Sequence, residues 1–278
     1  MKILIPIDGS ELSMNAVRYA AGQPVLFGDN PEIHIFYAQV PASSRILSVS
    51  DPETMDDFYR EEAKNVFEDI VAKCGAMPDN VSFDYGIGEP ADTIVKAADD
   101  FQADFVVMGT HGRGAIDSLL FGSVANEVVH HSHRPILMIR HRIPTVLAMS
   151  NIAVAVDDSE QSRRVKAFFE SHAGAFAKGT HFTLVHVEDH EGQNTGSAND
   201  ACGIAAELRR VLEDAGMTVT STTLYGSAGE KIAEFSEAQG VEMLVMGSHG
   251  YGPVTATMVG STTMKVASHC DTPLLIIR

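Results

Sequence analysis

Basic residues are scarce in this chain, which has 20 Lys and Arg against 37 Asp and Glu and a formal net charge of −17. So much negative charge opposes binding to the phosphate backbone of nucleic acid or to anionic lipid. No apolar run approaches the roughly 20 residues of a membrane span, and the first residues turn polar after Ile7, unlike a signal peptide. We therefore expect neither nucleic acid nor membrane among its partners.

Cysteine is also rare, and the three copies, Cys74, Cys202 and Cys270, form no CxxC pair. This pattern fits a reducing compartment, so we expect a cytoplasmic protein.

Two phosphate-binding signatures are missing as well. The chain has no G-x-x-x-x-G-K-[ST] motif, and no glycine fingerprint follows its first predicted strand. These absences argue against a P-loop and against a dinucleotide-binding fold.

The sequence is organised around residues 106–124, which read VVMGTHGRGAIDSLLFGSV. A short apolar run at 105–108 predicts a buried strand, and a loop with three glycines follows it. Gly122 and Ser123 then open a segment with helical spacing. Glycines let a backbone approach a ligand closely, and a helix N-terminus adds unpaired N–H donors. Together these features predict an anion cradle.

The same pattern recurs at 244–262, LVMGSHGYGPVTATMVGST, at a constant offset of 138 residues. Both copies follow G-x-x-G-x9-G-[ST]. Around them, short apolar runs alternate with amphipathic segments in each half of the chain. This alternation predicts a parallel sheet with helices on both faces. We expect two similar α/β domains, at 1–141 and 150–278, with the apolar junction 141–149 packed between them.

The carboxylates and cradles are placed to meet at the ends of strands. In an open α/β sheet, ligands bind beyond the carboxyl ends of the strands, where the strand order reverses. Asp8 and Asp157 follow the first strand of each half, and Gly109 and Gly247 end the fourth. A carboxylate suits a sugar hydroxyl or an exocyclic amine, and a cradle suits phosphates, so the pair predicts a nucleotide site. The alternative is that the aspartates are turn residues and the glycines make tight strand–helix turns.

The chain resembles the universal stress protein family, in its tandem, ATP-binding form. The resemblance rests on PIDGSE, VVMGTHGRG, GSV and RPILMIR in the first half, and on AVDDSE, LVMGSHGYG, GST and TPLLIIR in the second. It implies two Rossmann-like domains of the adenine nucleotide alpha hydrolase type, each a five-stranded parallel sheet of order 3-2-1-4-5. It also implies a stress-response role, ATP with Mg²⁺ as ligand, and a pseudo-dimer within the chain whose fifth strands form the interface. A homodimer and a protein partner of unknown identity are further assemblies to expect.

The resemblance implies one nucleotide site in each half. In the first half the matching positions are Pro6, Asp8, Ala38, Met108, Gly109, Gly112, Gly122, Ser123 and Val124. In the second they are Asp157, Val187, Met246, Gly247, Gly250, Gly260, Ser261 and Thr262. The second half departs from the family pattern, with Ala155 in place of the proline and Thr262 in place of the valine.

Arg113 is a candidate phosphate partner because it is the only Lys or Arg in either cradle loop, and Tyr251 takes its place in the second copy. A solvated loop arginine is the alternative reading. Proline at position 6 also pre-sets the backbone at the entry to the first site. We therefore expect the first site to bind ATP more tightly than the second.

Two classes of function remain open: an ATP-binding regulatory protein with little or no turnover, and a slow ATP-hydrolysing enzyme of the nucleotide alpha hydrolase type. Such enzymes grip pyrophosphate with a serine- and glycine-rich loop after the first strand, where this chain has DGSE and DDSE. No catalytic constellation repeats in both halves, so we assign no catalytic residue. His130, His131 and His133 resemble a metal cluster, but histidines also favour the negative end of a helix dipole, so we assign no metal ligand.

Overall fold

The computed structural model describes residues 1–22, 31–42, 51–75, 77, 79–110, 122–140, 150–188, 203–248 and 259–278. The elements of the first half are β1 (Lys2–Ile7), α1 (Glu11–Gly22), β2 (Glu32–Gln39), α4 (Pro52–Cys74), β3 (Val81–Ile87), α5 (Pro90–Asp100), β4 (Phe105–Gly109), α6 (Ser123–His131) and β5 (Ile136–Ile139). Those of the second half are β6 (Asn151–Ala155), α7 (Glu160–His172), a 3₁₀ turn (Ala173–Ala175), β7 (His181–Glu188), α8 (Gly203–Asp214), β8 (Thr218–Tyr225), α9 (Ala228–Ala238), β9 (Met243–Gly247), α10 (Ser261–His269) and β10 (Leu274–Ile277). The predicted alternation of strands and helices is confirmed in both halves.

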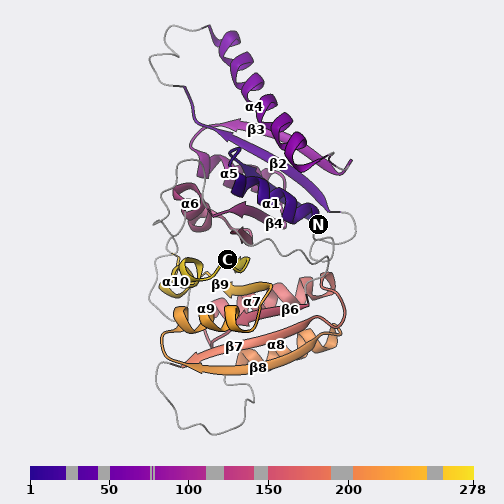
Figure 1. The fold of residues 1–278 in the computed structure, drawn as a ribbon, viewed down its shortest axis with the longest axis vertical. Coiled ribbons are helices and arrows are strands. Elements are labelled where there is room, and N and C mark those ends of the chain that lie inside the picture. The colour runs from indigo at the N-terminus through magenta and orange to yellow at the C-terminus, as the bar shows by residue number, and fades with distance from the viewer. Residues whose placement is uncertain are drawn as a thin grey trace.

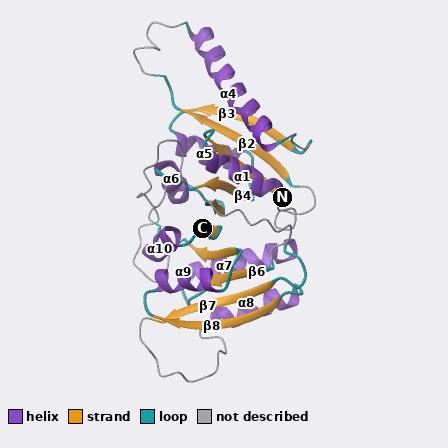
Figure 2. Ribbon diagram, viewed as in Figure 1, coloured by secondary structure: helices purple, strands orange, loops and turns teal. Residues whose placement is uncertain are grey.

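The ten strands form one sheet in the order β3-β2-β1-β4-β5-β10-β9-β6-β7-β8 (Figure 2). Within each half every printed pairing is parallel, and the order 3-2-1-4-5 is confirmed twice. The two halves meet through β5 and β10, which pair antiparallel with Leu137 opposite Leu275. The fifth strands therefore form the interface, as expected. The junction 141–149, which we expected between the halves, lies outside the described residues.

Alternate strand residues point to opposite faces of the sheet, and each face has its own core cluster. Ile3 and Ile5 belong to the face covered by α1, α4, α7 and α8, whereas Leu4 belongs to the face covered by α5, α6, α9 and α10. The first cluster is continuous across the halves, since the ring of Phe105 packs edge-on against Phe168 with centroids 5.7 Å apart. The two halves (Figure 1) thus share a core as well as a sheet.

Helix α4 begins earlier than the sequence reading predicted. The acidic, polar residues from Ser43 to Asp57 predict a loop that leads into this helix, but the helix starts at Pro52, directly after Asp51 in the N-cap position. Proline is favoured at the first helical position because its missing N–H has no helical partner there, and Glu53 suits the positive end of the dipole. Among the described residues, no helix is long and apolar enough to span a membrane.

Candidate functional site

The structure brings the predicted carboxylates and cradles together. Strand β1 lies between β2 and β4, so the strand order reverses beside it, and Asp8 at its carboxyl end neighbours the end of β4 at Gly109. The second half repeats this, because β6 lies between β7 and β9. Each half therefore has the reversal of strand order beside which open α/β sheets bind ligands.

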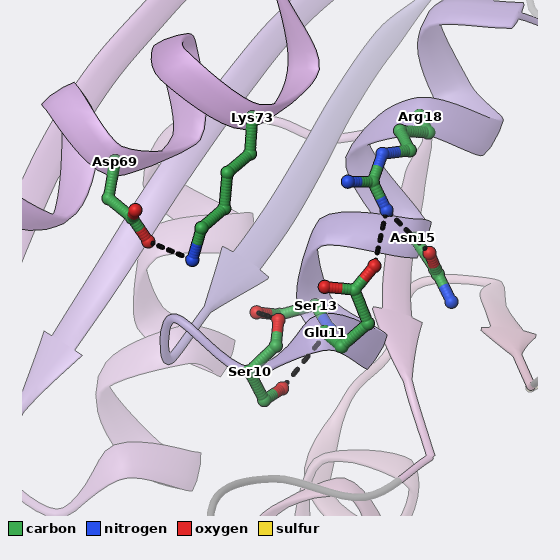
Figure 3. Close-up of polar contacts among 7 residues, drawn as sticks. All are labelled: Ser10, Glu11, Ser13, Asn15, Arg18, Asp69 and Lys73. Atoms are coloured by element: carbon green, nitrogen blue, oxygen red, sulfur yellow. Dashed lines mark hydrogen bonds and ion pairs between the residues drawn. The ribbon is translucent and has the colours of Figure 1, made fainter.

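The turn from β1 into α1 is built on Asp8. Its Oδ1 accepts a hydrogen bond from the Ser10 N–H at 2.9 Å, and Ser10 Oγ accepts from the Ser13 N–H at 3.2 Å. Ser10 therefore caps α1 (Figure 3), while the Ser13 hydroxyl donates to the Ser10 carbonyl at 2.9 Å. Asp8 is thus a turn residue, and the turn holds its carboxylate just beyond the carboxyl end of β1.

In the corresponding turn of the second half, Asp157 accepts hydrogen bonds from two serines. Asp157 Oδ1 accepts from the Ser159 N–H at 3.1 Å, from the Ser159 hydroxyl, and from the Ser162 hydroxyl at 2.6 Å. Ser159 in turn caps α7 by accepting from the Ser162 N–H at 3.3 Å. The orientation of the Asp157 carboxylate is therefore set by its own helix.

Gly109 is a glycine because of packing. A Cβ at this position would lie 2.9 Å from the carbonyl carbon and oxygen of Leu12 in α1, closer than real Cβ contacts. Since those atoms are backbone, they cannot move aside easily. The lack of a side chain at Gly109 therefore lets α1 cross the end of β4, a packing role that neither the ligand-binding nor the tight-turn interpretation of this glycine included.

Both cradle loops are closed at their base by the same pair of hydrogen bonds. In the first half the Thr110 N–H donates to the Ile139 carbonyl at 3.2 Å, and the Gly122 N–H donates to the Thr110 carbonyl at 2.6 Å. In the second half Ser248 and Gly260 make the corresponding bonds at 2.9 and 2.8 Å. We call these closed ends the loop stems. The intervening residues, including the predicted Gly112, Arg113 and Gly250, lie outside the described residues.

Helices α6 and α10 begin at the loop stems with glycine as N-cap. Gly122 has φ −59° and Gly260 φ −63°, angles open to any residue, so backbone conformation does not require glycine at either position. Glycine has no side chain with which to cap the first-turn N–H groups. In α6 the first helical bond runs from Asn126 to the Gly122 carbonyl, so the N–H groups of residues 123–125 precede it. These donors suit an anion.

The expected base-contacting residues lie on one face of the sheet. Met108 is buried in the second core cluster, and Ala38 and Val124 pack against it. Met246 and Val187 have the same positions in the second half. The hydroxyl-bearing residues Ser123 and Ser261 are exposed at the first helical position of α6 and α10, and Thr262 is half-buried beside the latter. These residues therefore lie near the end of the fourth strand and the start of the following helix in each half, with Ala38 and Val187 packed on the same face of the sheet.

Pro6 has a role that the sequence reading missed. The Asp104 N–H donates to the Lys2 carbonyl, so the backbone N–H and carbonyl of Lys2 point toward β4. Because these directions alternate along a strand, the backbone groups of Leu4 and Pro6 point toward β4 as well. Proline has no N–H to give, and the β1–β4 pairing ends at Leu4. In the second half, where Ala155 replaces Pro6, the β6–β9 pairing continues for one more pair, Val154 with Val245. The presence of a proline inside a predicted central strand is the sequence signal from which this early end of the pairing could have been predicted.

A second missed feature is a tether between α10 and β9. The Thr263 hydroxyl, 1% exposed, donates to the Gly247 carbonyl at 3.1 Å. The corresponding residue of α6 is Ala125, which has no hydroxyl. Helix α10 is therefore fixed to the strand beneath its cradle by a bond that α6 lacks.

The three histidines at the end of α6 do not assemble a metal site. Among the described residues, no group of three or more His, Cys, Asp or Glu side chains is arranged to hold a metal ion. Burial, followed by the charges of Arg278 and His131, lowers the pKa of His130 below its ordinary value, against the opposing charge of Glu127.

Comparison with known proteins accounts for the duplication. The model of the Universal stress protein family matches residues 1–140 and again 149–278. A universal stress protein of Mycolicibacterium smegmatis is 25% identical over 294 residues, covering 99% of this chain and 96% of its own. Universal stress protein MJ0577 of Methanocaldococcus jannaschii is 30% identical over 154 residues, covering 51% of this chain and 95% of its own.

Among solved structures, a universal stress protein from Archaeoglobus fulgidus DSM 4304 superimposes with a TM-score of 0.69 at 22% identity. It covers 100% of this chain and 96% of its own, so the likeness extends through both halves and their arrangement. With two consecutive matches to the family model that together span nearly all its residues, the chain belongs to the universal stress protein family.

Proposed function

We propose that this chain is an ATP-binding regulatory protein of the stress response, with one nucleotide site in each of two domains, 1–141 and 150–278. One observation carries the proposal: a closed loop stem followed by a glycine-capped helix N-terminus occurs twice with the same hydrogen bonds. Each copy lies beside the strand that ends at Asp8 or Asp157. An anion-binding end and a carboxylate thus share one crevice in both halves.

The phosphates would lie at the N-termini of α6 and α10. There the first-turn N–H groups and the exposed Ser123 and Ser261 hydroxyls are the donors. Charge-assisted hydrogen bonds contribute about 1.5–3 kcal/mol each. A few of them would supply much of the roughly 8 kcal/mol that a micromolar dissociation constant needs. Mg²⁺ bound with ATP would neutralise part of the phosphate charge in a chain that is itself strongly negative.

The nucleoside would lie against the apolar residues nearer the sheet. In the first half these are Met108, which belongs to the second core cluster, and Ala38 and Val124, which pack against that cluster. The Asp8 carboxylate is the acceptor suited to a ribose hydroxyl. Val187 and Met246, with Asp157, have the same positions in the second half. This arrangement supports an adenine nucleotide in preference to free phosphate.

Regulation is favoured over turnover by the turns after β1 and β6. A hydrolase of related fold would grip pyrophosphate there, but the serines of both turns are engaged in capping α1 and α7. Nucleotide occupancy would then bias conformation or the choice of a protein partner. We place the protein in the cytoplasm, because its three cysteines without a CxxC pair fit a reducing compartment.

The direct experiment is to purify the protein without added nucleotide and to identify bound small molecules by mass spectrometry. We expect ATP or ADP in the released fraction, and retention of added ATP by protein that had lost it. Phosphate release from ATP, measured in the same preparation, distinguishes the two functions: turnover that is abolished in the Gly122→Val, Gly260→Val double variant would identify an enzyme and overturn the regulatory assignment.

A further inference from the structure

Two arginines end the strands that join the halves. The β5–β10 pairing is centred on Leu137 opposite Leu275, with Ile136 opposite Ile276. Because the pairing is antiparallel, the carboxyl end of each strand reaches the start of the other. Arg140 follows β5 and Arg278 follows β10, 138 residues apart like the cradles. The pairing thus delivers each arginine into the opposite half.

Arg278 reaches the end of α6, the cradle helix of the first half. Its Nε donates to the Ser132 carbonyl at 3.1 Å, and its Nη2 donates to the His130 carbonyl at 2.6 Å. The last carbonyls of a helix have no partner within the helix and carry the negative end of its dipole. A guanidinium satisfies both the hydrogen bonds and the charge.

Arg140 makes the reciprocal contact with α10. Its Nη1 donates to the carbonyls of Ala267 and Cys270, the latter at 2.9 Å. Its Nε lies 3.7 Å from Asp271 Oδ1. Cys270 and Ser132 are the C-cap residues of α10 and α6. The two contacts are therefore related by the approximate two-fold symmetry that relates the halves.

Both contacts are shielded from water. Ser132 is 1% and Cys270 2% exposed, and the Arg140 side chain is 16% exposed. Burial, with the nearby charge of Arg164, lowers the pKa of Arg278. In such surroundings no water replaces a lost guanidinium easily, so removal of either arginine leaves buried carbonyls without a partner.

The helices held in this way begin at the loop stems. Helices α6 and α10 have nine residues each, a length of about 13 Å, so a shift at the C-terminus is transmitted to the N-terminus. A small cavity also brings Thr110, at the stem of the first cradle, beside Arg140, Ala267 and Cys270. The end of α10 thus lies next to the other half's cradle.

We propose that Arg140 and Arg278 are positioning residues, each of which holds the cradle helix of the opposite half, so that each nucleotide site is complete only when the halves are joined. The inference rests on the proposed function. It goes beyond that function in making the affinity of one site depend on a residue of the other half.

The test measures ATP affinity at one site at a time by calorimetry. Gly260→Val leaves the first site for measurement, and Gly122→Val leaves the second. Adding Arg278→Met to the Gly260→Val variant is expected to weaken ATP binding about 2- to 30-fold, the range of couplings carried through packed elements. Adding it to the Gly122→Val variant is expected to leave the second site unchanged. Arg140→Met should show the reverse pattern.

Two variants control for general loss of stability. Arg209→Met removes another partly buried arginine that donates to a backbone carbonyl, that of Val219 at 2.8 Å, within the second half alone. It should leave the first site unchanged. Arg278→Lys keeps the charge and one donor group, so it should recover part of the affinity lost in Arg278→Met.

Hydrogen exchange without nucleotide provides a second readout. In Arg278→Met the amides of α6, such as Val128 and Val129, should exchange faster while those of α10 do not. Weakening of both sites alike, weakening of the arginine's own half, or unchanged α6 exchange would each overturn the inference. If the otherwise unchanged protein binds no ATP, the proposed function fails separately, and the exchange measurement alone decides whether Arg278 positions the helix.

Discussion

The two halves share a topology but hold their crevices differently. In the first half β1 separates from β4 after Leu4, because Pro6 faces β4 without an N–H. In the second half the equivalent strands stay paired for one more residue, with Ala155 in the proline's place. One imino acid therefore ends the β1–β4 pairing a residue earlier, although both halves have the same strand order.

The second half also adds hydrogen bonds around its crevice. The Ser162 hydroxyl donates to Asp157, whereas the corresponding Ser13 hydroxyl donates to a backbone carbonyl. Thr263 ties α10 to the Gly247 carbonyl, and the corresponding Ala125 makes no such bond. The two halves thus keep the same strand order, and α10 has a side-chain tether that α6 lacks. The two sites should therefore differ in affinity and stiffness.

The largest expected effect is the loss of one site at a time. Gly122→Val places a β-branched side chain at the N-cap of α6, where a phosphate would approach, and its φ of −59° suits valine. ATP binding at the first site should weaken at least about tenfold, roughly 1.4 kcal/mol. The second site should be retained, and Gly260→Val should give the converse.

Titration of these two single-site variants also tests the order of the sites. We expect the Gly260→Val variant, which retains the first site, to bind ATP more tightly than the Gly122→Val variant, which retains the second. The difference in affinity between the two sites should become smaller when Arg113→Ala is added and when the salt concentration is raised. Tighter binding by the Gly122→Val variant would show that contacts to the base, where Val187 is larger than Ala38, outweigh crevice opening and phosphate charge.

An exchange of residues at the strand ends tests the role of Pro6. In Pro6→Ala the restored N–H can extend the β1–β4 pairing, and opening the crevice then requires breaking a hydrogen bond of about 0.5–1.5 kcal/mol. First-site affinity should fall about two- to tenfold. Ala155→Pro should strengthen the second site or leave it open to larger nucleotides. Unchanged affinities in both variants would mean that the pairing difference has no bearing on binding.

Much of the fold could be predicted from the sequence, since the short apolar runs, the alternation with amphipathic segments and the constant offset of the repeats are visible there. The start of α4 was missed because the acidic residues after Pro52 suit a helix's first turn as well as a loop. The packing role of Gly109 depends on Leu12, which is distant in sequence. The arginine contacts needed the antiparallel β5–β10 pairing, which no local pattern encodes.

A smaller effect is expected from the tether of α10. Thr263→Ala removes one buried hydrogen bond and should lower the free energy of unfolding by about 1 kcal/mol. The matched variant Ala125→Thr introduces the same hydroxyl at the corresponding position of α6. If this hydroxyl reaches the Gly109 carbonyl, the free energy of unfolding should rise by part of that amount. Chemical unfolding of both variants measures the difference. Equal stability of Thr263→Ala and the unaltered protein would show that the bond makes no net contribution.

The smallest effect concerns pH. Burial lowers the pKa of His130 and of His34 below their ordinary value of 6.5 in the folded state, although Asp84 and Glu32 oppose the shift at His34. The unfolded chain then binds more protons between the folded pKa and 6.5, so stability should fall as the pH drops through this window. Urea unfolding between pH 7.5 and 5.5 should show a shallower dependence in His130→Gln. If the stability of His130→Gln depends on pH as that of the unaltered protein does, another titrating group must cause the dependence.

The central claim, two nucleotide sites built on duplicated cradles, is tested most directly by calorimetric titration with ATP and Mg²⁺. The unaltered chain should bind about two equivalents with micromolar-class affinity, and the Gly122→Val, Gly260→Val double variant should bind neither while remaining folded by circular dichroism. Unchanged binding in the folded double variant would contradict the site assignment, and absence of binding in the unaltered chain would contradict the proposed function itself.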